Sequence, residues 1–440
     1  MPLLNLLLDD VFYGSADGKW LYPLINGNVD WPINLGLMLA ALAGALVALT
    51  WRHAEQAPVL VVVVWLGFGS WAQSQMRELA PFPDTDVVGS KYDCFCKESK
   101  SYQPGRFLRE FHTIAPDLHF HVRANMAGKV LFYHLIRVVS DKSPTLVWLV
   151  FGASNLGAVL AYAIVWELFR DRRAALAALV LYLFLPSKLF FFPLLNSVTP
   201  VFILFLLWLQ VRYLAKPHAG WLAAMGVALY ALVLFEPLPL VTGLVFLALI
   251  GRAWALGAIA RKHVLSVLVL VPVAFFVVDL LVWWGFGYEI MSAFRFALHD
   301  AQEFNKQQNR PYGLWVVFNL VETLSNTGLL ASGLALGLFA AGAVRLVRAF
   351  RSVGWAGVRV IACEPGVCLS FSTLATLLVV DALGVNRGET VRLWIFLGVF
   401  LVLPVSGLCG RRPAVLAVLV LGAIMQACIG LQSRGFVLPG

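Results

Sequence analysis

One short stretch of the chain concentrates charge beside an apolar run. In LGVNRGETVRLWIFLG, residues 383–398, Arg387, Glu389 and Arg392 lie within six positions. Guanidinium groups bind phosphate through two parallel hydrogen bonds, and the free N–H groups of a helix N-terminus also attract anions. The stretch therefore predicts a phosphate site in which the two arginines are the donors and Glu389 orients them.

A purely structural role explains part of the same stretch. Asn386 is of a type favoured at a helix N-cap, and Glu389 three positions later would complete a capping box. Arg392 is also spaced for an ion pair with Glu389. This interpretation leaves Arg387 unused, and it puts a cation in the first helical turn, where the helix dipole opposes it. At the level of sequence both interpretations stay open.

A second candidate centre is the turn PFPDTDVVGSKYD, residues 81–93. Asp84 and Asp86 form a D-x-D pair behind two prolines, which favour a fixed turn. A carboxylate at a membrane surface can take the proton from an acceptor hydroxyl as that hydroxyl attacks. The alternative is a solvated acidic turn without chemistry. Asp84 and Asp86 are the candidate general bases, with Asp93 nearby.

Polar side chains also follow the outer ends of several apolar segments. Ionisable groups at membrane depth are costly, and they usually face a cavity or a partner. For Lys188 and Glu236, the alternative is that the side chain reaches up to the membrane interface. The residues predicted to share an outward-facing cavity are Lys188, Asn196, Glu236 and Asp279.

Cysteine and histidine do not form a recognisable metal site in the sequence. Of the six cysteines, four fall in or beside apolar segments, and Cys94 and Cys96 have no partner pair at zinc-site spacing. The histidines of the first polar loop, His112, His119, His121 and His134, lack a matching carboxylate cluster. We predict no metal site and no required cofactor, and a dependence on divalent metal stays open.

The composition is that of a membrane protein. The chain is 60% hydrophobic and 13% charged, and its mean hydropathy is +0.81. About 20 apolar residues suffice to cross the hydrocarbon core of a bilayer. The predicted fold is an all-α polytopic membrane protein of about twelve spans, at residues 35–51, 57–75, 144–168, 174–192, 199–215, 220–236, 238–251, 264–285, 325–347, 366–383, 391–408 and 413–432.

The charges between these spans indicate an orientation. Arginine and lysine gather in alternate short connections, and basic short loops face the cytoplasm. Both termini are then outside, and the net charge of +9 reports topology rather than binding to nucleic acid. The chain has no N-x-S/T sequon, which argues against a eukaryotic secretory protein. We expect a multi-pass protein of the bacterial cell membrane, with its active site on the outer face.

The outer side holds the larger polar segments of a single membrane domain, residues 1–440. Residues 76–143 form a first long loop, residues 286–324 a second, and residues 1–34 a further outer segment with Trp20 and Trp31. The stretches GRFLREFHTI and VRANMAGKVLFYHLIRVV of the first loop have apolar residues at helical spacing. They predict amphipathic helices that lie on the membrane surface.

Two parts of the chain resemble a known family. Residues 125–192, from NMAGKVLFYHLIR onward, resemble the region after the first outer loop in polytopic glycosyltransferases of the GT-C superfamily. NRGETVRLW is similar to an NRGE-x-x-R-[IL]-W stretch in membrane proteins assigned to that superfamily. The resemblance implies transfer of a sugar from a polyprenyl-phosphate donor, with inversion, to a glycan, lipid or protein acceptor. It also implies that Asp84 or Asp86 is the base and that Arg387 and Arg392 hold the lipid phosphate.

Two other classes of function remain as alternatives. Twelve spans and an intramembrane Asp279 also suit a secondary transporter or a lipid flippase. Transporters, however, often repeat their sequence in two halves and place ionisable groups near the midplane, whereas here no repeat is evident and the polar groups cluster outward. A non-catalytic membrane subunit, whose outer loops bind a partner, is the third possibility.

Overall fold

Helices form the framework of the chain. The computed structural model describes residues 30–80, 83–88 and 93–431, and within these ranges every regular element is helical apart from one isolated bridge between Val88 and Asp93. Most of the predicted outer segment 1–34, including Trp20, lies outside the described residues. The all-α class predicted from the sequence is confirmed for the described part of the chain.

Each predicted span coincides with a helix, and within the described residues ten helices are long and apolar enough to cross a membrane. Helices α13 and α22 are apolar but shorter, with 17 and 15 residues, so the expected count of twelve stays a prediction. The chain is a polytopic helical membrane protein. The apolar helices are α2 (Asp30–His53), α3 (Pro58–Arg77), α9 (Ser143–Phe169), α10 (Arg172–Leu183) with α11 (Pro186–Phe190), α12 (Thr199–Ala215), α13 (Ala219–Phe235), α14 (Gly243–Ala255), α15 (Arg261–Phe286), α18 (Leu329–Val353), α20 (Pro365–Leu383), α22 (Ile395–Cys409) and α23 (Pro413–Leu431).

Helices α10 and α22 form the centre of the bundle. From Ala174 onward every residue of α10 is buried, and α22 is buried over nearly its whole length. Small residues allow the close packing, since Gly157 of α9 leaves room for the Tyr182 ring, whose hydroxyl donates to the Ser154 carbonyl at 2.9 Å. Helices α15 and α18 instead expose many apolar side chains, as expected of lipid-facing helices.

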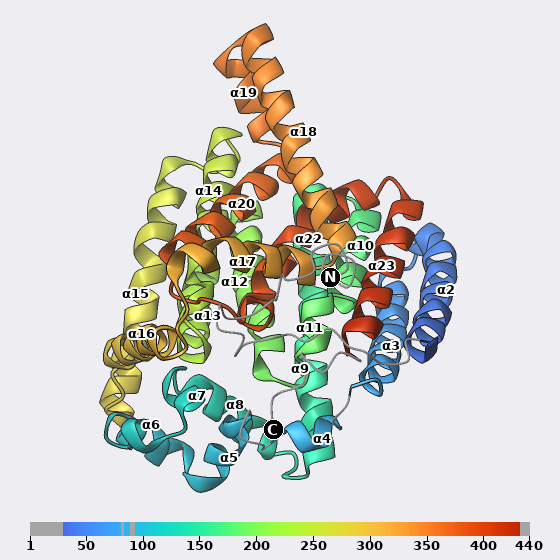
Figure 1. Cartoon of the computed structure of the whole chain (residues 1–440). Coiled ribbons are helices and arrows are strands. Elements are labelled where there is room, and N and C mark those ends of the chain that lie inside the picture. The colour runs from blue at the N-terminus through green and yellow to red at the C-terminus, as the bar shows by residue number, and fades with distance from the viewer. Residues whose placement is uncertain (1–29, 81–82, 89–92, 432–440) are drawn as a thin grey trace.

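The first long loop, predicted to be on the outer side, folds into a compact helical assembly below the bundle, the outer assembly (Figure 1). The predicted amphipathic stretches are helical, as α6 and α8. Phe107, Phe111 and Tyr133 are fully buried against the protein, whereas Leu135, Val138 and Val139 are exposed. The placement of these helices on the membrane surface stays a prediction. Phe111 packs edge-on against Tyr288, which follows α15. The assembly consists of α4 (Asp84–Val87), α5 (Cys94–Ser101), α6 (Pro104–Ile114), η1 (Ala115–Asp117), α7 (Phe120–Arg123) and α8 (Gly128–Arg137).

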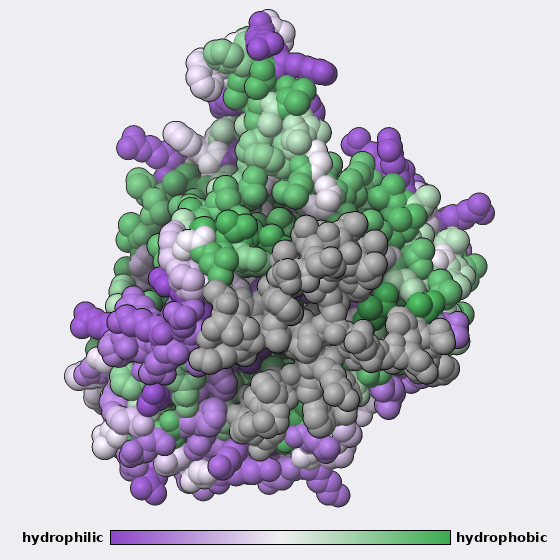
Figure 2. All heavy atoms as spheres, viewed as in Figure 1, coloured by the Kyte–Doolittle hydropathy of each residue, from purple (hydrophilic) through white to green (hydrophobic). Residues whose placement is uncertain are grey.

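The second outer loop is also helical, as α16 (Ile290–Gln307) and α17 (Tyr312–Asn326). Polar residues gather over the end of the molecule that holds the first outer assembly and α16, whereas apolar residues cover the bundle (Figure 2). At the opposite end, α18 and the short α19 (Trp355–Ala362) project as a hairpin (Figure 1). The hairpin and the polar loops are therefore at opposite ends of the molecule.

One close backbone contact joins the outer assembly to the bundle. Helix α8 begins at Gly128, directly against the end of α13, and a Cβ added at Gly128 would lie 2.4 Å from the carbonyl oxygen of Leu234. Only glycine fits at that distance. The contact brings Lys129 beside Glu236, the residue that follows α13, with Nζ and Oε2 3.0 Å apart.

Replacing this glycine should loosen the junction. We expect Gly128→Ala to destabilise the protein by about 1–3 kcal/mol, because overpacking a closed contact forces the backbones apart. The measurement is thermal unfolding of the full chain in detergent. Gly152→Ala is the matched control, since it adds the same methyl group to an exposed position of α9 with open space around it. Equal melting temperatures for both variants would contradict the close-contact interpretation.

Candidate functional site

A cavity of about 300 Å³ lies between the outer assembly and the bundle. Residues of α7, α8 and α16 line it on one side, and the connections that follow α13 and α20 line it on the other. Most of the lining is apolar, with Phe95, Phe120, Phe294 and Phe304 contributing rings. Its volume is at the lower end of the range for small-molecule sites.

The connection after α20 supplies the polar wall of the cavity. Glu389 has a left-handed backbone with φ of 59° and immediately precedes α21 (Thr390–Leu393). Its carboxylate binds Arg310 at 2.8 Å and also pairs with Arg392. Burial raises the pKa of Glu389, but the adjacent Arg392 and Arg310 outweigh it and hold the pKa below its ordinary value. Glu389 therefore stays ionised between two cations.

The geometry of this connection corrects one expectation and confirms another. Asn386 does not cap a helix, because the residue before α21 is Glu389, whose side chain makes no cap hydrogen bond. The capping box predicted from the sequence is therefore wrong. The predicted ion pair between Glu389 and Arg392 is present. Glu389 has a left-handed backbone, so it cannot be the third residue of a helix. Its carboxylate is instead the counter-ion of Arg310 and Arg392.

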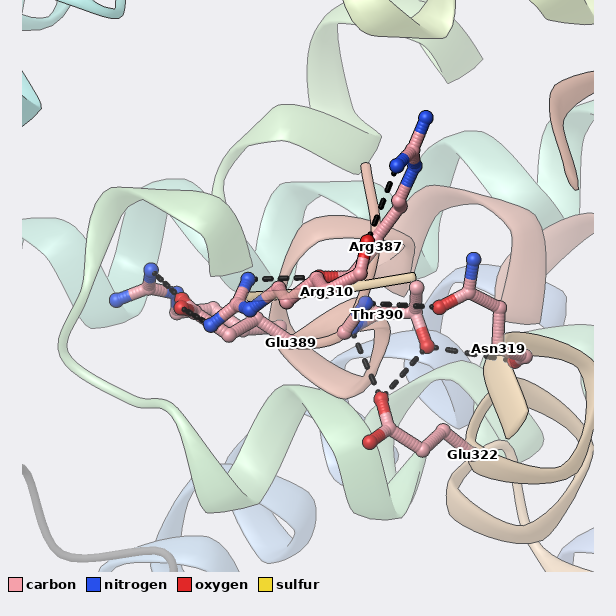
Figure 3. A network of polar contacts seen from close by, with 8 residues as sticks. Arg310, Asn319, Glu322, Arg387, Glu389 and Thr390 are labelled. Carbon is pink, nitrogen blue, oxygen red and sulfur yellow. Dashed lines mark hydrogen bonds and ion pairs between the residues drawn. The ribbon is translucent and has the colours of Figure 1, made fainter. Parts of the chain in front are cut away.

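Arg387 points away from Glu389 (Figure 3). Its guanidinium donates to the carbonyl oxygens of Gly384 at 3.2 Å and Arg310 at 3.0 Å, and it lies over the Tyr312 ring. Arg310 donates in return to the Arg387 carbonyl at 2.7 Å. Arg387 lines the cavity, but part of its hydrogen-bonding capacity is already used to fix the backbone.

Helix α17 holds the connection in place from the other side (Figure 3). The Asn319 amide donates to the Asn386 carbonyl at 3.0 Å and accepts from the Gly388 N–H at 2.9 Å. The Glu322 carboxylate accepts from both the N–H and the hydroxyl of Thr390, at 3.1 and 2.8 Å. Burial raises the pKa of Glu322 to about 7, although the bonds from Thr390 oppose the shift.

The opposite wall carries a second buried ion pair, between Lys129 and Glu236. Lys129 Nζ also donates to Asn125 Oδ1 at 2.8 Å and lies over the rings of Phe95 and Phe235. The Glu236 carboxylate accepts from the Thr199 hydroxyl at 2.6 Å. Both charged side chains are nearly inaccessible from outside, as the low-dielectric interior requires of a paired buried charge.

The cavity as a whole favours an anion. Burial and the nearby Arg392 lower the pKa of His121 to about 4, so its imidazole is neutral. The described lining then has four cationic residues and two anionic ones, and an apolar remainder. A ligand that matches both features is an amphiphilic anion. The charged residues are Lys129, Arg310, Arg387 and Arg392 against Glu236 and Glu389.

The structure brings some of the sequence-predicted site residues together. Arg387, Glu389 and Arg392 line the cavity with Asn196 and Glu236, although these two groups lie in distant parts of the sequence. Glu236 is 4% exposed, so it does not extend to the membrane interface.

Other predicted residues do not line this cavity. Lys188 is buried in the bundle, where Nζ donates to Asn155 Oδ1 at 2.6 Å and lies over the Tyr182 ring. Its expected extension to the interface is therefore wrong. Asp279 lies on α15 and has no hydrogen-bond partner for Oδ1 among the described residues. Neither residue is part of the cavity lining.

The predicted bases Asp84 and Asp86 are also outside the cavity lining. Asp84 begins α4 and forms an ion pair with Arg77 at 2.5 Å, and Arg77 in turn donates to the Leu189 carbonyl at 3.0 Å. Asp84 thus ties the outer assembly to α3 and α11. Asp86 is exposed and is not part of the cavity lining. Their catalytic role stays a prediction.

Sequence reasoning missed four residues that build the site: Lys129, Arg310, Asn319 and Glu322. Lys129 lies on a helix that the sequence analysis placed on the membrane surface. The sequence held signals for three of them. Arg310 lies in NRPYG, and Asn319 and Glu322 are polar residues of an otherwise apolar helix. Polar groups on such a helix need buried partners.

Histidine and cysteine contribute no metal site within the described residues, since no three His, Cys, Asp or Glu side chains gather there. His112 Nε2 accepts from the Glu289 N–H at 3.1 Å. His119 Nδ1 accepts from the His121 N–H. The first contact joins α6 to the residue before α16, and the second shapes the start of α7.

Fold and site together define a polytopic helical membrane protein with a buried, cationic, largely apolar cavity. Comparison with models of known protein families gave no match, and the comparison with curated proteins gave none either.

The anchoring by α17 is testable through stability. Asn319→Ala should leave the Gly388 N–H and the Asn386 carbonyl without their buried partner, which costs roughly 1–3 kcal/mol for each group. Asn326→Ala, on the same helix, is the control, because its side chain bonds only to the helical carbonyl of Glu322. Thermal unfolding in detergent measures both. A larger loss in Asn326→Ala would contradict the anchoring role of Asn319.

Glu322 should give the protein a pH-dependent stability. Its folded pKa of about 7 is above the ordinary 4.5, so the folded state binds an additional proton between these values. The contribution of Glu322 to stability should be largest below about pH 4.5 and fall as the pH rises through about 7. Glu322→Gln, which keeps an oxygen for Thr390, should flatten this part of the curve. Unfolding midpoints across roughly pH 5–8 test this, and an unchanged slope in the variant would refute it.

Proposed function

We propose that the chain is a membrane glycosyltransferase that binds a polyprenyl-phosphate-linked sugar in this cavity and transfers the sugar to an acceptor hydroxyl at the outer membrane face. The observation that carries the proposal is the pairing of an arginine-rich wall with an apolar lining in one buried cavity. A lipid phosphate needs both features, since its phosphate requires donors and its chain requires apolar surroundings. The class of transferase also rests on the sequence resemblance to the GT-C superfamily.

Arg392 is the best-placed phosphate donor. Its side chain is 14% exposed, and it lines the cavity. One N–H group of the guanidinium, at Nε, is buried and has no hydrogen-bond partner among the described residues. Because Nε is enclosed, a phosphate would bind the accessible part of the guanidinium. Arg387 contributes charge at the same wall.

The cavity also has an apolar route to the membrane. Leu240 and Leu383 line the cavity and are 42% and 60% exposed. Leu240 lies in η3 (Leu238–Thr242), and Leu383 ends the apolar helix α20. A lipid chain can extend over these side chains into the bilayer while its phosphate stays at the arginines.

The proposed reaction is a single displacement. The acceptor oxygen attacks the sugar carbon that carries the phosphate, the carbon–oxygen bond to the phosphate breaks, and the configuration inverts. Negative charge builds on the departing phosphate, so the guanidinium groups stabilise the transition state more than the ground state. Loss of one such donor typically costs about 3 kcal/mol of transition-state stabilisation.

A second candidate is a membrane protein that binds or moves a lipid phosphate without transferring sugar. The specific observation that favours it is that the predicted bases, Asp84 and Asp86, do not line the cavity. Sugar transfer distinguishes the two candidates, because both predict binding of the lipid but only the transferase releases free polyprenyl phosphate.

The donor site is tested by binding and transfer with the full chain in nanodiscs, against a panel of radiolabelled polyprenyl-phosphate sugars. Arg392→Ala should weaken donor binding about 10–100-fold, because a hydrogen bond to a charged group contributes about 1.5–3 kcal/mol. Arg106→Ala, on the exposed face of α6 with a side chain 66% accessible, is the matched control and should bind as the wild type.

Binding and transfer test different parts of the proposal. If no donor of the panel binds, the lipid-phosphate site is wrong. If a donor binds with Arg392-dependent affinity but no sugar leaves the lipid in the presence of membrane acceptors, the transferase is wrong and the non-catalytic candidate replaces it.

A further inference from the structure

Two carboxylates line the described cavity, and they differ in what they can accept. Both oxygens of Glu389 are occupied, Oε1 by Arg310 and Oε2 by Arg392. A carboxylate whose two oxygens both accept from guanidinium groups has no free oxygen for an acceptor hydroxyl. Glu389 is therefore suited to hold the arginines and not to remove a proton.

Glu236 is different, because only one of its oxygens is occupied. Oε2 lies 3.0 Å from Lys129 Nζ and accepts from the Thr199 hydroxyl at 2.6 Å. No hydrogen bond to Oε1 is formed by the described residues. The residue is 4% exposed and lines the cavity. Oε1 is not fully enclosed by the protein. Because Glu236 lines the cavity, we infer that Oε1 opens onto it.

The surroundings of Glu236 fix its position. The residue follows the last turn of α13, its N–H donates to the Leu232 carbonyl at 2.7 Å, and Pro237 comes next. Lys129 is itself fixed by Asn125 and by the close contact at Gly128. Lys129 and Thr199 are positioning residues, because they hold Oε2 and thereby direct Oε1.

We propose that Glu236 is the general base of the transfer reaction, an inference that rests on the proposed function. The acceptor hydroxyl donates its hydrogen bond to Glu236 Oε1. As the acceptor oxygen forms its bond to the sugar carbon, the proton passes to Oε1, and the electron pair of the breaking carbon–oxygen bond remains on the phosphate. Polyprenyl phosphate leaves, and Glu236 then loses the proton to water.

The geometry favours Glu236 over the other candidates. Asp84 is bound to Arg77, and neither Asp84 nor Asp86 is part of the cavity lining. His121 also lines the cavity, and a variant of each residue separates the two. Glu236 and Arg392 line the same cavity from different elements, as a base and a leaving-group site must in a displacement.

The test compares three variants of similar size to the wild-type residues in the nanodisc transfer assay: Glu236→Gln, Asp86→Asn and His121→Gln. The amide of the glutamine in E236Q is not a base, yet its oxygen can still accept from Lys129 and Thr199. We expect E236Q to lower kcat by about 100-fold or more, within the range for loss of a general base, while donor affinity stays close to that of the wild type. In D86N and H121Q, kcat should fall far less than in E236Q. Glu110→Gln is the matched control, because it makes the same change in an exposed ion pair of α6 outside the cavity lining, and it should keep kcat near the wild-type value.

The outcomes separate this inference from the proposed function. Wild-type kcat in E236Q, or a loss of about 100-fold in D86N or H121Q instead, would overturn the assignment while sugar transfer stands. Failure of the wild type to transfer any sugar would remove the function and the base together. If E236Q folds poorly, Glu236→Asp keeps the charge opposite Lys129 but withdraws the oxygen, and kcat should then fall by about tenfold or more. Unchanged kcat in E236D would equally overturn the proposal.

Discussion

The site depends on how α17 holds a short, strained connection. Between α20 and α21 the chain passes through Gly388 at φ of 78° and Glu389 at φ of 59°, conformations that are unfavourable for most residues. Asn319 and Glu322 satisfy the backbone and the Thr390 hydroxyl there, and Trp315 packs so closely on Gly388 that a Cβ would lie 2.9 Å from its ring. Without these contacts, neither Glu389 nor Arg392 would have a fixed position.

The two charged walls of the cavity follow the same physical rule. Each places a carboxylate beside a cation from a distant segment, Glu389 with Arg310 and Glu236 with Lys129. Breaking such a pair leaves an uncompensated buried charge, so the walls also join the outer helices to the bundle. The walls differ in their remaining polar groups. The wall with Glu389 has excess positive charge, whereas the wall with Glu236 has a carboxylate oxygen without a hydrogen bond from the described residues.

The sequence was sufficient for the features that depend on local pattern. Apolar length located the spanning helices, and the density of charge around Arg387 and Arg392 located one wall of the cavity. Partners from distant segments could not be predicted in this way. Arg310 and Glu322 meet the 385–392 connection only in three dimensions, and so do Lys129 and Glu236. The capping box failed because tertiary ion pairs determine the conformation of Glu389. The burial of Phe107, Phe111 and Tyr133 against protein also depends on distant segments.

Under the proposed function, the exposed leucines at the cavity, Leu240 and Leu383, change which concentration of the ligand matters. A lipid that arrives over them is drawn from the leaflet and not from solution. Its relevant concentration is a mole fraction among the surrounding lipids, and dilution of the sample does not alter it. Occupancy is then set by the composition of the membrane, and two membranes with the same total amount of the lipid can load the protein to different extents.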